Sequence, residues 1–212
     1  RYFQIQYENA VAHVLPFIEH SFLIKSHMRV LEIGAGEGGV LRAFTERGCK
    51  AVGVELDPLR VEWACGFLWE EIGRGQLFYV EKDIYKTDLI NELKGGFDII
   101  LLKDVIEHIH DQPKLFRLLH TLLNPGGVIF FGFPPWQMPF GGHQQVLAHR
   151  LLSRTPYFHL LPVPLYRGIL KAFGETPASI ENTLEIKETG ISIERFERLV
   201  GKNHFSIVLR TY

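Results

Sequence analysis

Short apolar runs alternate with segments of helical character over the first two thirds of the chain, and this alternation constrains the fold more than any other feature. The runs predicted to be strands lie at 29–33, 51–55, 77–81, 97–102 and 128–133. Helices are predicted at 40–47, 58–72, 87–93 and 105–123, the last with a break at 111–113. Strands that alternate with helices form a parallel sheet through right-handed crossovers. The sequence therefore predicts a doubly wound α/β fold with a mainly parallel sheet.

The pattern changes after residue 133, where proline and aromatic residues become frequent. Seven prolines lie between residues 134 and 180, and short helices are predicted at 145–153 and 165–173. A helix near 192–201 and a strand at 205–212 complete the expected order of elements.

A chain of 212 residues is long enough for one well-buried domain and short for two. We therefore expect a single α/β domain in four parts. These parts are an N-terminal helical cap at 1–28, a cofactor-binding core at 29–133, a helical lid inserted after the fifth strand at 134–190, and a last helix and strand at 191–212.

A glycine-rich stretch directly follows the first predicted strand. Gly34, Gly36 and Gly39 have the G-x-G-x-x-G spacing of a dinucleotide site, in which amides at a helix start bind a pyrophosphate. Glycine also lets the backbone approach any other ligand closely. The spacing alone therefore leaves two alternatives open, an NAD-dependent oxidoreductase and an enzyme with a different cofactor.

Acidic residues at the ends of three consecutive predicted strands discriminate between these alternatives. Glu32 lies two positions before Gly34, where a carboxylate crowds a pyrophosphate but suits an ammonium or sulfonium group. Glu55 ends the second strand, where a carboxylate can accept hydrogen bonds from ribose hydroxyls, and Asp83 follows the third strand, in reach of an adenine amino group. Because ligands of such sheets bind beyond the carboxyl ends of the strands, these residues favour an adenosyl ligand that carries positive charge.

Five segments, in this order, resemble the motifs of class I S-adenosylmethionine-dependent methyltransferases, which have a Rossmann-like fold. The segments are 30–38, 52–57, 81–84, 97–108 and 124–127. The resemblance covers residues 29–133 and implies a methyltransferase whose cofactor is S-adenosylmethionine. It further implies cofactor contacts from a set of residues at the strand ends: Glu32, Gly34, Ala35, Gly36, Glu55, Leu56, Asp83, Ile84 and Lys103.

Methyl transfer from a sulfonium is an in-line displacement, for which alignment of the reactants is the main requirement. A general base assists when the acceptor is a hydroxyl group. Asp104, Glu107 and His108 follow the fourth strand with i, i+3, i+4 spacing, which predicts that they share one helix face. His143 lies in the loop after the fifth strand. We expect His143, His108 and Glu107 to be catalytic residues.

The same four residues are also candidate ligands of a divalent metal that lowers the pKa of an acceptor hydroxyl. They are similar to the metal-binding pattern of small-RNA 2′-hydroxyl methyltransferases, except that Asp104 stands where that family has Glu. Three interpretations stay open: a metal site of Asp104, Glu107, His108 and His143, a metal-free base at His143, and a structural role for His143 in its loop.

Charge and composition narrow the choice of acceptor. A formal net charge of −1 lacks the excess of positive charge that is typical of domains that bind nucleic acid. We therefore favour a small, partly apolar molecule with a hydroxyl or amine over metal-assisted O-methylation of nucleic acid. A non-catalytic binding module with the same fold is a further alternative, and the sequence specifies no oligomeric state.

Apolar residues of the 134–190 segment are expected to form a lid over the acceptor, with a helical cap packed on the sheet, a dimer contact or a membrane-surface contact as alternatives. They are Trp136, Met138, Phe140, Tyr157, Phe158, Leu160, Leu161, Leu165, Tyr166, Ile169 and Phe173. Two cysteines without metal-like spacing predict a cytoplasmic protein. The lack of a run of about 18 apolar residues predicts that the chain has no transmembrane segment.

Overall fold

A computed structural model describes residues 1–86, 89–93 and 96–211, and the chain divides into two compact units. The first, called the sheet unit, comprises Arg1–Lys103, Leu115–Phe131 and Ile207–Tyr212. The second, called the helical unit, comprises Asp104–Lys114 and Gly132–Ser206. Each unit has a hydrophobic core of its own.

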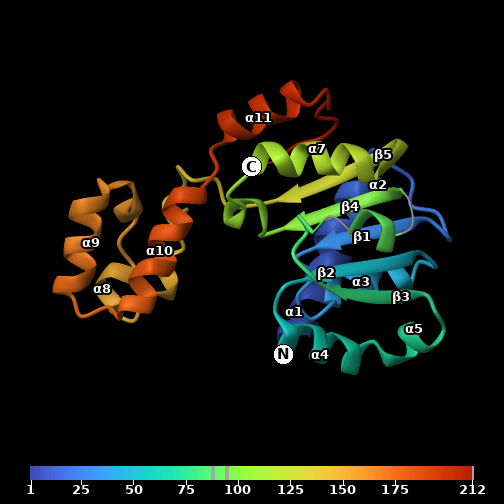
Figure 1. Cartoon of the computed structure of the whole chain (residues 1–212), viewed down its shortest axis with the longest axis horizontal. Coiled ribbons are helices and arrows are strands. Elements are labelled where there is room, and N and C mark those ends of the chain that lie inside the picture. Colours follow the sequence, from blue (N-terminus) through green and yellow to red (C-terminus); the bar gives the residue numbers. More distant parts are fainter. Residues whose placement is uncertain (87–88, 94–95, 212) are drawn as a thin grey trace. The chain divides into compact units, whose positions relative to one another are not determined.

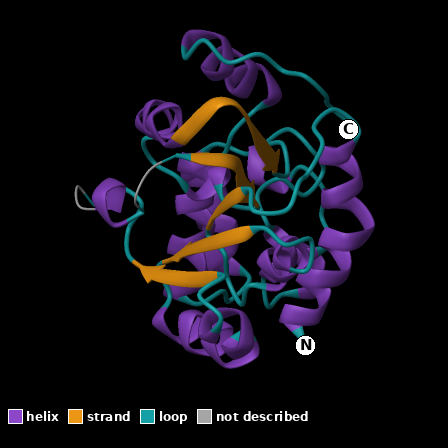
Figure 2. Cartoon of the chain, turned by 90° about the vertical axis from the view of Figure 1, so that its right-hand side faces the viewer, coloured by secondary structure: helices purple, strands orange, loops and turns teal. Residues whose placement is uncertain are grey.

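The predicted strands form one sheet with the order β3-β2-β1-β4-β5, which Figures 1 and 2 show. The strands are β1 (Arg29–Ile33), β2 (Lys50–Glu55), β3 (Leu77–Glu81), β4 (Phe97–Lys103) and β5 (Leu123–Gly132). β1 pairs in parallel with both β2 and β4, and β2 pairs in parallel with β3. The chain therefore winds outward from β1 in one direction and then returns to continue in the other, which confirms the doubly wound α/β fold.

Helices connect the strands of the sheet unit. They are α3 (Gly39–Thr45), α4 (Pro58–Phe67), α5 (Trp69–Gly73), α6 (Leu89–Glu92) and α7 (Gln112–Leu122). Asp57 caps α4, because its side chain accepts a hydrogen bond of 3.0 Å from the Leu59 amide, and Pro58 occupies the first turn. The single helix predicted at 58–72 is broken at Leu68, whose backbone leaves the helical region. Residues 87 and 88 of the predicted 87–93 helix lie outside the described residues.

The chain begins with a run of three helical segments. These are α1 (Tyr2–Asn9), a π-helical turn η1 (Ala10–Val14) and α2 (Leu15–Glu19). Ala10, Val14 and Leu15 belong to the same buried cluster as Phe44 of α3 and Ile99 of β4. The N-terminal helices are therefore part of the core of the sheet unit, and the removal of their apolar side chains from water stabilises it.

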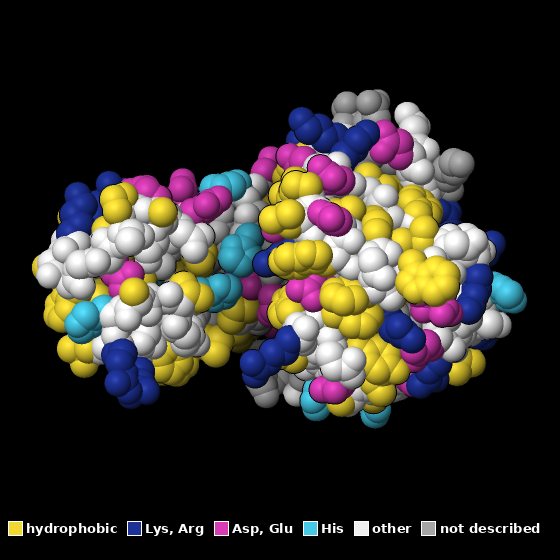
Figure 3. All heavy atoms as spheres, turned by 90° about the horizontal axis from the view of Figure 1, so that it is seen from below, with side chains coloured by type: hydrophobic (Ala, Val, Ile, Leu, Met, Phe, Trp, Pro, Cys, Tyr) yellow, Lys and Arg dark blue, Asp and Glu magenta, His cyan; other side chains and the backbone are white. Residues whose placement is uncertain are grey.

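One face of α4 is apolar and exposed. Leu59, Trp63 and Phe67 follow one another at intervals of four residues, which places them on one side of the helix. Their exposed fractions are 57%, 51% and 45%. Figure 3 views the molecule from the side of α4 and α5, and hydrophobic side chains gather there among charged ones. The sheet unit thus carries an exposed apolar stripe along α4.

The helical unit consists of short helices around its own core. They are η2 (Ile106–His108), η3 (Gln144–Val146), α8 (Arg150–Ser153), η4 (Phe158–Leu160), α9 (Val163–Ala172), α10 (Pro177–Thr189) and α11 (Ile193–Lys202). The core includes Tyr166 and Leu170, which are fully buried one helical turn apart on α9. No helix in the described part of the chain has the length and apolar character needed to cross a membrane.

Two expectations for the later part of the chain are wrong. The fifth strand, predicted to begin at residue 128, already begins at Leu123 as β5. The strand predicted at 205–212 is absent, because the described residues 205–211 adopt neither strand nor helix. Ile207 and Val208 are 43% and 68% exposed. Ile207 and Val208 therefore do not pack in a core, and strand propensity without packing is a weak determinant of strand structure.

Candidate active site

The glycine-rich loop after β1 has a backbone that favours glycine. Gly34, Gly36 and Gly38 have φ angles of 70°, 56° and 86°, in the left-handed region. The amides of Gly34 and Ala35 donate hydrogen bonds of 2.8 and 3.1 Å to the carbonyl of Val54 in β2. These bonds fix the loop at the carboxyl ends of the two strands.

Glu55 binds this loop through both carboxylate oxygens. Its Oε2 accepts a hydrogen bond of 2.8 Å from the Gly36 amide, and its Oε1 accepts bonds of 2.8 and 3.0 Å from the amides of Leu56 and Asp57. The side chain is 8% exposed. Glu55 therefore holds the end of β2 and the glycine loop together, a structural role in addition to the ribose contact that the sequence predicts.

Glu32 presents a different environment on β1. It is 1% exposed, and its Oε2 is buried without a hydrogen-bond partner among the described residues. Burial raises the pKa of this carboxyl group well above its ordinary value, Glu55 raises it further, and the ammonium group of Lys103 opposes the shift. A buried acceptor of this kind fits a ligand that brings a positive charge or an N–H donor.

The first helix covers the glycine loop, which sequence reasoning did not predict in detail. The side chain of Gln6 in α1 donates from Nε2 to the carbonyl of Ala35 at 3.4 Å and accepts at Oε1 from the amide of Gly39 at 3.3 Å. A Cβ atom on Gly36 would lie 2.9 Å from Gln6 Nε2. In addition, Glu37 Oε2 accepts a hydrogen bond of 2.7 Å from the Phe3 amide. Gln6 is thus a loop-binding residue, and no local pattern in the sequence marks it.

Tyr79 of β3 is a second residue that the sequence did not single out. It is paired in register with Gly53 of β2, and a Cβ atom on Gly53 would lie 2.7 Å from its ring. A Cβ atom on Gly38 would collide with the Tyr79 hydroxyl. That hydroxyl is buried without a hydrogen-bond partner among the described residues, and burial raises its pKa well above the ordinary value. Glycine at positions 38 and 53 therefore makes room for this ring beside the loop.

The remaining cofactor candidates differ in burial. Asp83 forms a turn, because its Oδ1 accepts a hydrogen bond of 2.8 Å from the Tyr85 amide. Ile84 is 6% exposed, whereas Leu56 is 68% exposed at the end of β2. Their contacts with a cofactor stay predictions.

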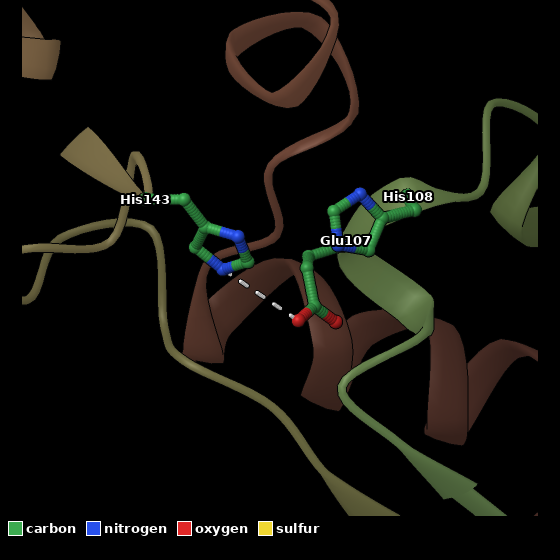
Figure 4. A group of neighbouring side chains, drawn as sticks. All are labelled: Glu107, His108 and His143. Carbon is green, nitrogen blue, oxygen red and sulfur yellow. Dashed lines mark ion pairs between the residues drawn. The ribbon is translucent and has the colours of Figure 1, made fainter. Parts of the chain in front are cut away.

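The predicted catalytic residues lie together within the helical unit. Figure 4 shows Glu107 and His108 on η2 and His143 on the loop that precedes η3, with all three side chains turned toward one another. One ligand atom from each lies within 4.8 Å of those of the other two. His143 Nε2 is 3.8 Å from Glu107 Oε1, and the centroids of the two histidine rings are 5.3 Å apart with their planes inclined at 68°. The Glu107 side chain is 1% exposed and that of His143 is 25% exposed.

The predicted helix face is wrong for Asp104. Residues 104–108 do not form an α-helix, because Asp104 has a φ angle of 56° and the 3-10 turn η2 spans only three residues. Asp104 therefore lies outside the group of three. It acts on the group by its charge, since it opposes the lowering of the His143 pKa that burial causes.

Buried polar side chains hold η2 in place. Gln112 is fully buried and donates from Nε2 to the carbonyls of Ile106 and Thr189, at 3.1 and 2.7 Å. Thr189, at the end of α10, donates from its hydroxyl to the carbonyl of Glu107. The position of the Glu107 backbone is thus set by α10 and by the start of α7.

The loop of His143 is fixed by a second buried pair. Gln144 Nε2 donates to the carbonyl of Pro139 at 2.9 Å and lies 3.3 Å from His159 Nδ1. His159 is fully buried, and its Nε2 is 2.7 Å from the carbonyl of Trp136. Burial lowers the pKa of His159. A neutral His159 that donates from Nε2 and accepts at Nδ1 satisfies both contacts.

The apolar residues expected to form a lid differ in burial. Phe158 and Tyr166 are 6% and 0% exposed and belong to the core of the helical unit. Others are exposed by 38% to 52%: Met138, Tyr157, Leu160, Leu165 and Phe173. Part of this set therefore stabilises the helical unit itself, and a lid over the acceptor stays a prediction.

The sequence matches the protein family described as "Methyltransferase domain" over residues 3–160. Two curated relatives are each named "Uncharacterized methyltransferase", from Mycobacterium sp. (strain KMS) and Mycolicibacterium gilvum (strain PYR-GCK), and are 34% and 30% identical over 122 and 125 residues. The matches cover 58% and 59% of this chain but 45% and 46% of the relatives. The chain therefore spans less than half the length of the curated relatives it matches.

Solved structures share the fold at low sequence identity. The cyclopropane synthase MmaA2 from Mycobacterium tuberculosis is 19% identical with a TM-score of 0.63, over 95% of this chain and 62% of its own. Phosphoethanolamine N-methyltransferase 2 from Haemonchus contortus, solved in complex with S-adenosyl-L-methionine, is 20% identical with a TM-score of 0.58. That match covers 94% of this chain and 40% of the other. Both likenesses support the Rossmann-like assignment.

Proposed function

This chain belongs to the class I family of S-adenosylmethionine-dependent methyltransferases, and on that premise we propose that it methylates a hydroxyl or amine of a small, partly apolar molecule. The alternative interpretation as an NAD-dependent oxidoreductase depended only on the glycine spacing, and membership of a methyltransferase family argues against it. A cytoplasmic location stays a prediction.

The cofactor residues that we propose are those of the sheet unit. When bound, S-adenosylmethionine supplies an electrophilic methyl group on its sulfonium. The buried Oε2 of Glu32, which has no partner among the described residues, fits the positive charge of such a ligand. The backbone of Gly34 and Gly36 gives close access to the loop, and Glu55 keeps that loop in place through the Gly36 amide.

The observation that carries the acceptor proposal is the group formed by Glu107, His108 and His143. An amine acceptor is often already a nucleophile, whereas a hydroxyl group must be activated by loss of its proton. Burial lowers the pKa of His143, so its imidazole is neutral near pH 7 and carries a lone pair. A buried carboxylate 3.8 Å away would stabilise positive charge on that ring. The group therefore favours a hydroxyl acceptor over an amine.

The experiment first establishes the cofactor and then the acceptor. Calorimetric titration with S-adenosylmethionine, its demethylated product and NADH should give micromolar binding of the two adenosyl ligands and none of NADH. Acceptors are then screened with methyl-labelled cofactor in matched pairs, each pair having one carbon skeleton with either a hydroxyl or an amine. The hydroxyl member should be methylated faster.

Variants connect the turnover to the proposed group. Glu107→Gln should lower kcat for a hydroxyl acceptor by about 100-fold or more, the range in which proton transfer contributes. His110→Ala is the matched control, because His110 is exposed and pairs with Glu185 at 3.2 Å. Faster methylation of the amines, with no effect of Glu107→Gln, would contradict the proposal.

A further inference from the structure

We propose that Glu107, His108 and His143 bind a divalent metal ion such as Zn²⁺. This inference rests on the proposed function and specifies how the acceptor hydroxyl is activated. All three residues lie in the helical unit, and their donor atoms are within 4.8 Å of one another. The inferred site is called the three-ligand site below.

The distances fit an ion between the side chains. A tetrahedral ion with ligands at about 2.0–2.1 Å holds neighbouring donor atoms roughly 3.4 Å apart. His143 Nε2 and Glu107 Oε1 are 3.8 Å apart, longer than a hydrogen bond. Side-chain rotations that bring donor atoms closer, by about 0.4 Å for this pair and by up to about 1.4 Å for the widest pair, would therefore complete the site.

Burial of the carboxylate supports the same conclusion. The Glu107 side chain is 1% exposed. Buried carboxylates in proteins are paired with charges or coordinate metals, because an isolated buried charge is very unfavourable. A divalent cation held between Glu107 and His143 would balance the charge of a carboxylate in this buried position.

The surroundings of the three-ligand site are fixed in the way that metal ligands require. Hydrogen bonds from the side chains of Thr189 and Gln112 hold the backbone at Glu107 and Ile106. The residue after His143 is Gln144, whose buried side chain anchors the loop. Such supporting contacts orient the ligands and contribute to metal affinity.

The donor set indicates which ions bind. Two imidazole nitrogens and one carboxylate oxygen suit Zn²⁺, Co²⁺, Mn²⁺ or Fe²⁺, whereas Mg²⁺ and Ca²⁺ prefer oxygen ligands throughout. Three protein ligands are also the number found in catalytic zinc sites, where a further position is open to water or substrate. Three of the four ligands expected from the sequence have donor atoms within 4.8 Å of one another, and a contribution from Asp104 stays a prediction.

An ion at this position would select hydroxyl acceptors. The acceptor oxygen would bind at the open position, and its O–H bond would break with release of the proton to solvent. The oxygen lone pair would then form the new C–O bond while the methyl C–S bond of the sulfonium breaks and its electron pair stays on sulfur. The ion is neither oxidised nor reduced in this step.

Metal binding is tested on the whole chain without reliance on turnover. Protein freed of metal by a chelator is titrated with Zn²⁺ and Mg²⁺ by calorimetry, and Co²⁺ is added to record the visible absorption of a low-coordinate site. We expect one Zn²⁺ per chain, a Co²⁺ spectrum and at least about 100-fold weaker binding of Mg²⁺. Glu107→Gln and His143→Ala should each lower Zn²⁺ affinity by at least about 100-fold.

Controls separate this proposal from the proposed function. His110→Ala should retain Zn²⁺ affinity, because His110 does not belong to the three-ligand site. Binding of S-adenosylhomocysteine should be unchanged in every variant, which shows that each one folds. Equal Zn²⁺ affinity of the wild type and Glu107→Gln, or full methylation of a hydroxyl acceptor in the presence of chelator, would overturn the metal site alone. Failure of the wild type to bind S-adenosylmethionine and S-adenosylhomocysteine would instead overturn the proposed function.

Discussion

Glu32 places a carboxyl group inside the sheet unit, 1% exposed and next to the loop that we propose for the cofactor. Burial and the neighbouring charge of Glu55 raise its pKa, against the attraction of Lys103. In the folded, unliganded protein the protonated form is therefore favoured more strongly than in the unfolded chain. The same environment becomes favourable to the charged form when a cation binds.

This environment gives Glu32→Gln two effects of opposite sign. Because the folded-state pKa of Glu32 is raised, its protonated form contributes stability at low pH, and this contribution is lost as the pH rises through the folded-state pKa. The neutral amide avoids that loss. We expect the Tm of Glu32→Gln to exceed that of the wild type by at least about 2 °C at pH 8. This difference in Tm should become smaller as the pH is lowered toward 4. Thermal unfolding across this pH range measures it.

Glu32→Gln should also weaken the binding of the cofactor. A hydrogen bond to a charged group contributes about 1.5–3 kcal/mol, so affinity for S-adenosylmethionine should fall about tenfold to 100-fold. Glu81→Gln, at an exposed position at the end of β3, is the control and should change neither quantity. A lower Tm together with unchanged affinity would mean that Glu32 has only a structural role.

At the element scale, α1 is bound to the glycine loop by side chains rather than by strand pairing. Gln6 bridges the carbonyl of Ala35 and the amide of Gly39. The contact joins positions about 30 residues apart in the sequence, so it forms only when α1 packs on α3. The helix therefore contributes to the shape of the loop that receives the ligand.

We expect Gln6→Ala to weaken S-adenosylhomocysteine binding about tenfold, since two hydrogen bonds that hold the loop are lost. Gln4→Ala is the matched control on the same helix, because Gln4 is exposed and bonds only to Glu8 among the contacts described for it. Calorimetric titration of both variants gives the comparison. Equal affinities would show that α1 supports the fold without shaping the cofactor site.

At the scale of the whole molecule, the proposed cofactor residues and the three-ligand site belong to different compact units. The sheet unit contains Glu32, the glycine loop and Glu55, and the helical unit contains Glu107, His108 and His143. Each unit has its own buried cluster. Damage to one core should therefore affect one binding property before the other.

Leu170→Ala tests this separation. Leu170 is fully buried in the core of the helical unit, and loss of a buried leucine side chain costs about 2–5 kcal/mol. We expect much weaker Zn²⁺ binding with unchanged affinity for S-adenosylhomocysteine, both measured by calorimetry. Leu165→Ala on the same helix, where the side chain is 52% exposed, should leave both unchanged. Parallel loss of both ligands in Leu170→Ala would show that the units do not act separately.

Local patterns in the sequence determined the strands, the doubly wound order and the glycine loop. The alternation of apolar runs with helices and the glycine-rich stretch after the first strand are properties of a few neighbouring residues. The structure confirms the strands and their doubly wound order. The same local reasoning was wrong where packing decides. Residues 205–211 have the composition of a strand but form none, since strand propensity depends on packing that they lack.

Tertiary structure alone decided which side chains meet. It bound Glu55 to the Gly36 amide, placed Gln6 over the glycine loop and joined His143 to Glu107. It also replaced the helix face predicted for Asp104 by a turn, because Asp104 has a left-handed backbone conformation. Contacts between residues this far apart depend on loop geometry and on the packing of whole elements, and the periodicity of a sequence encodes neither.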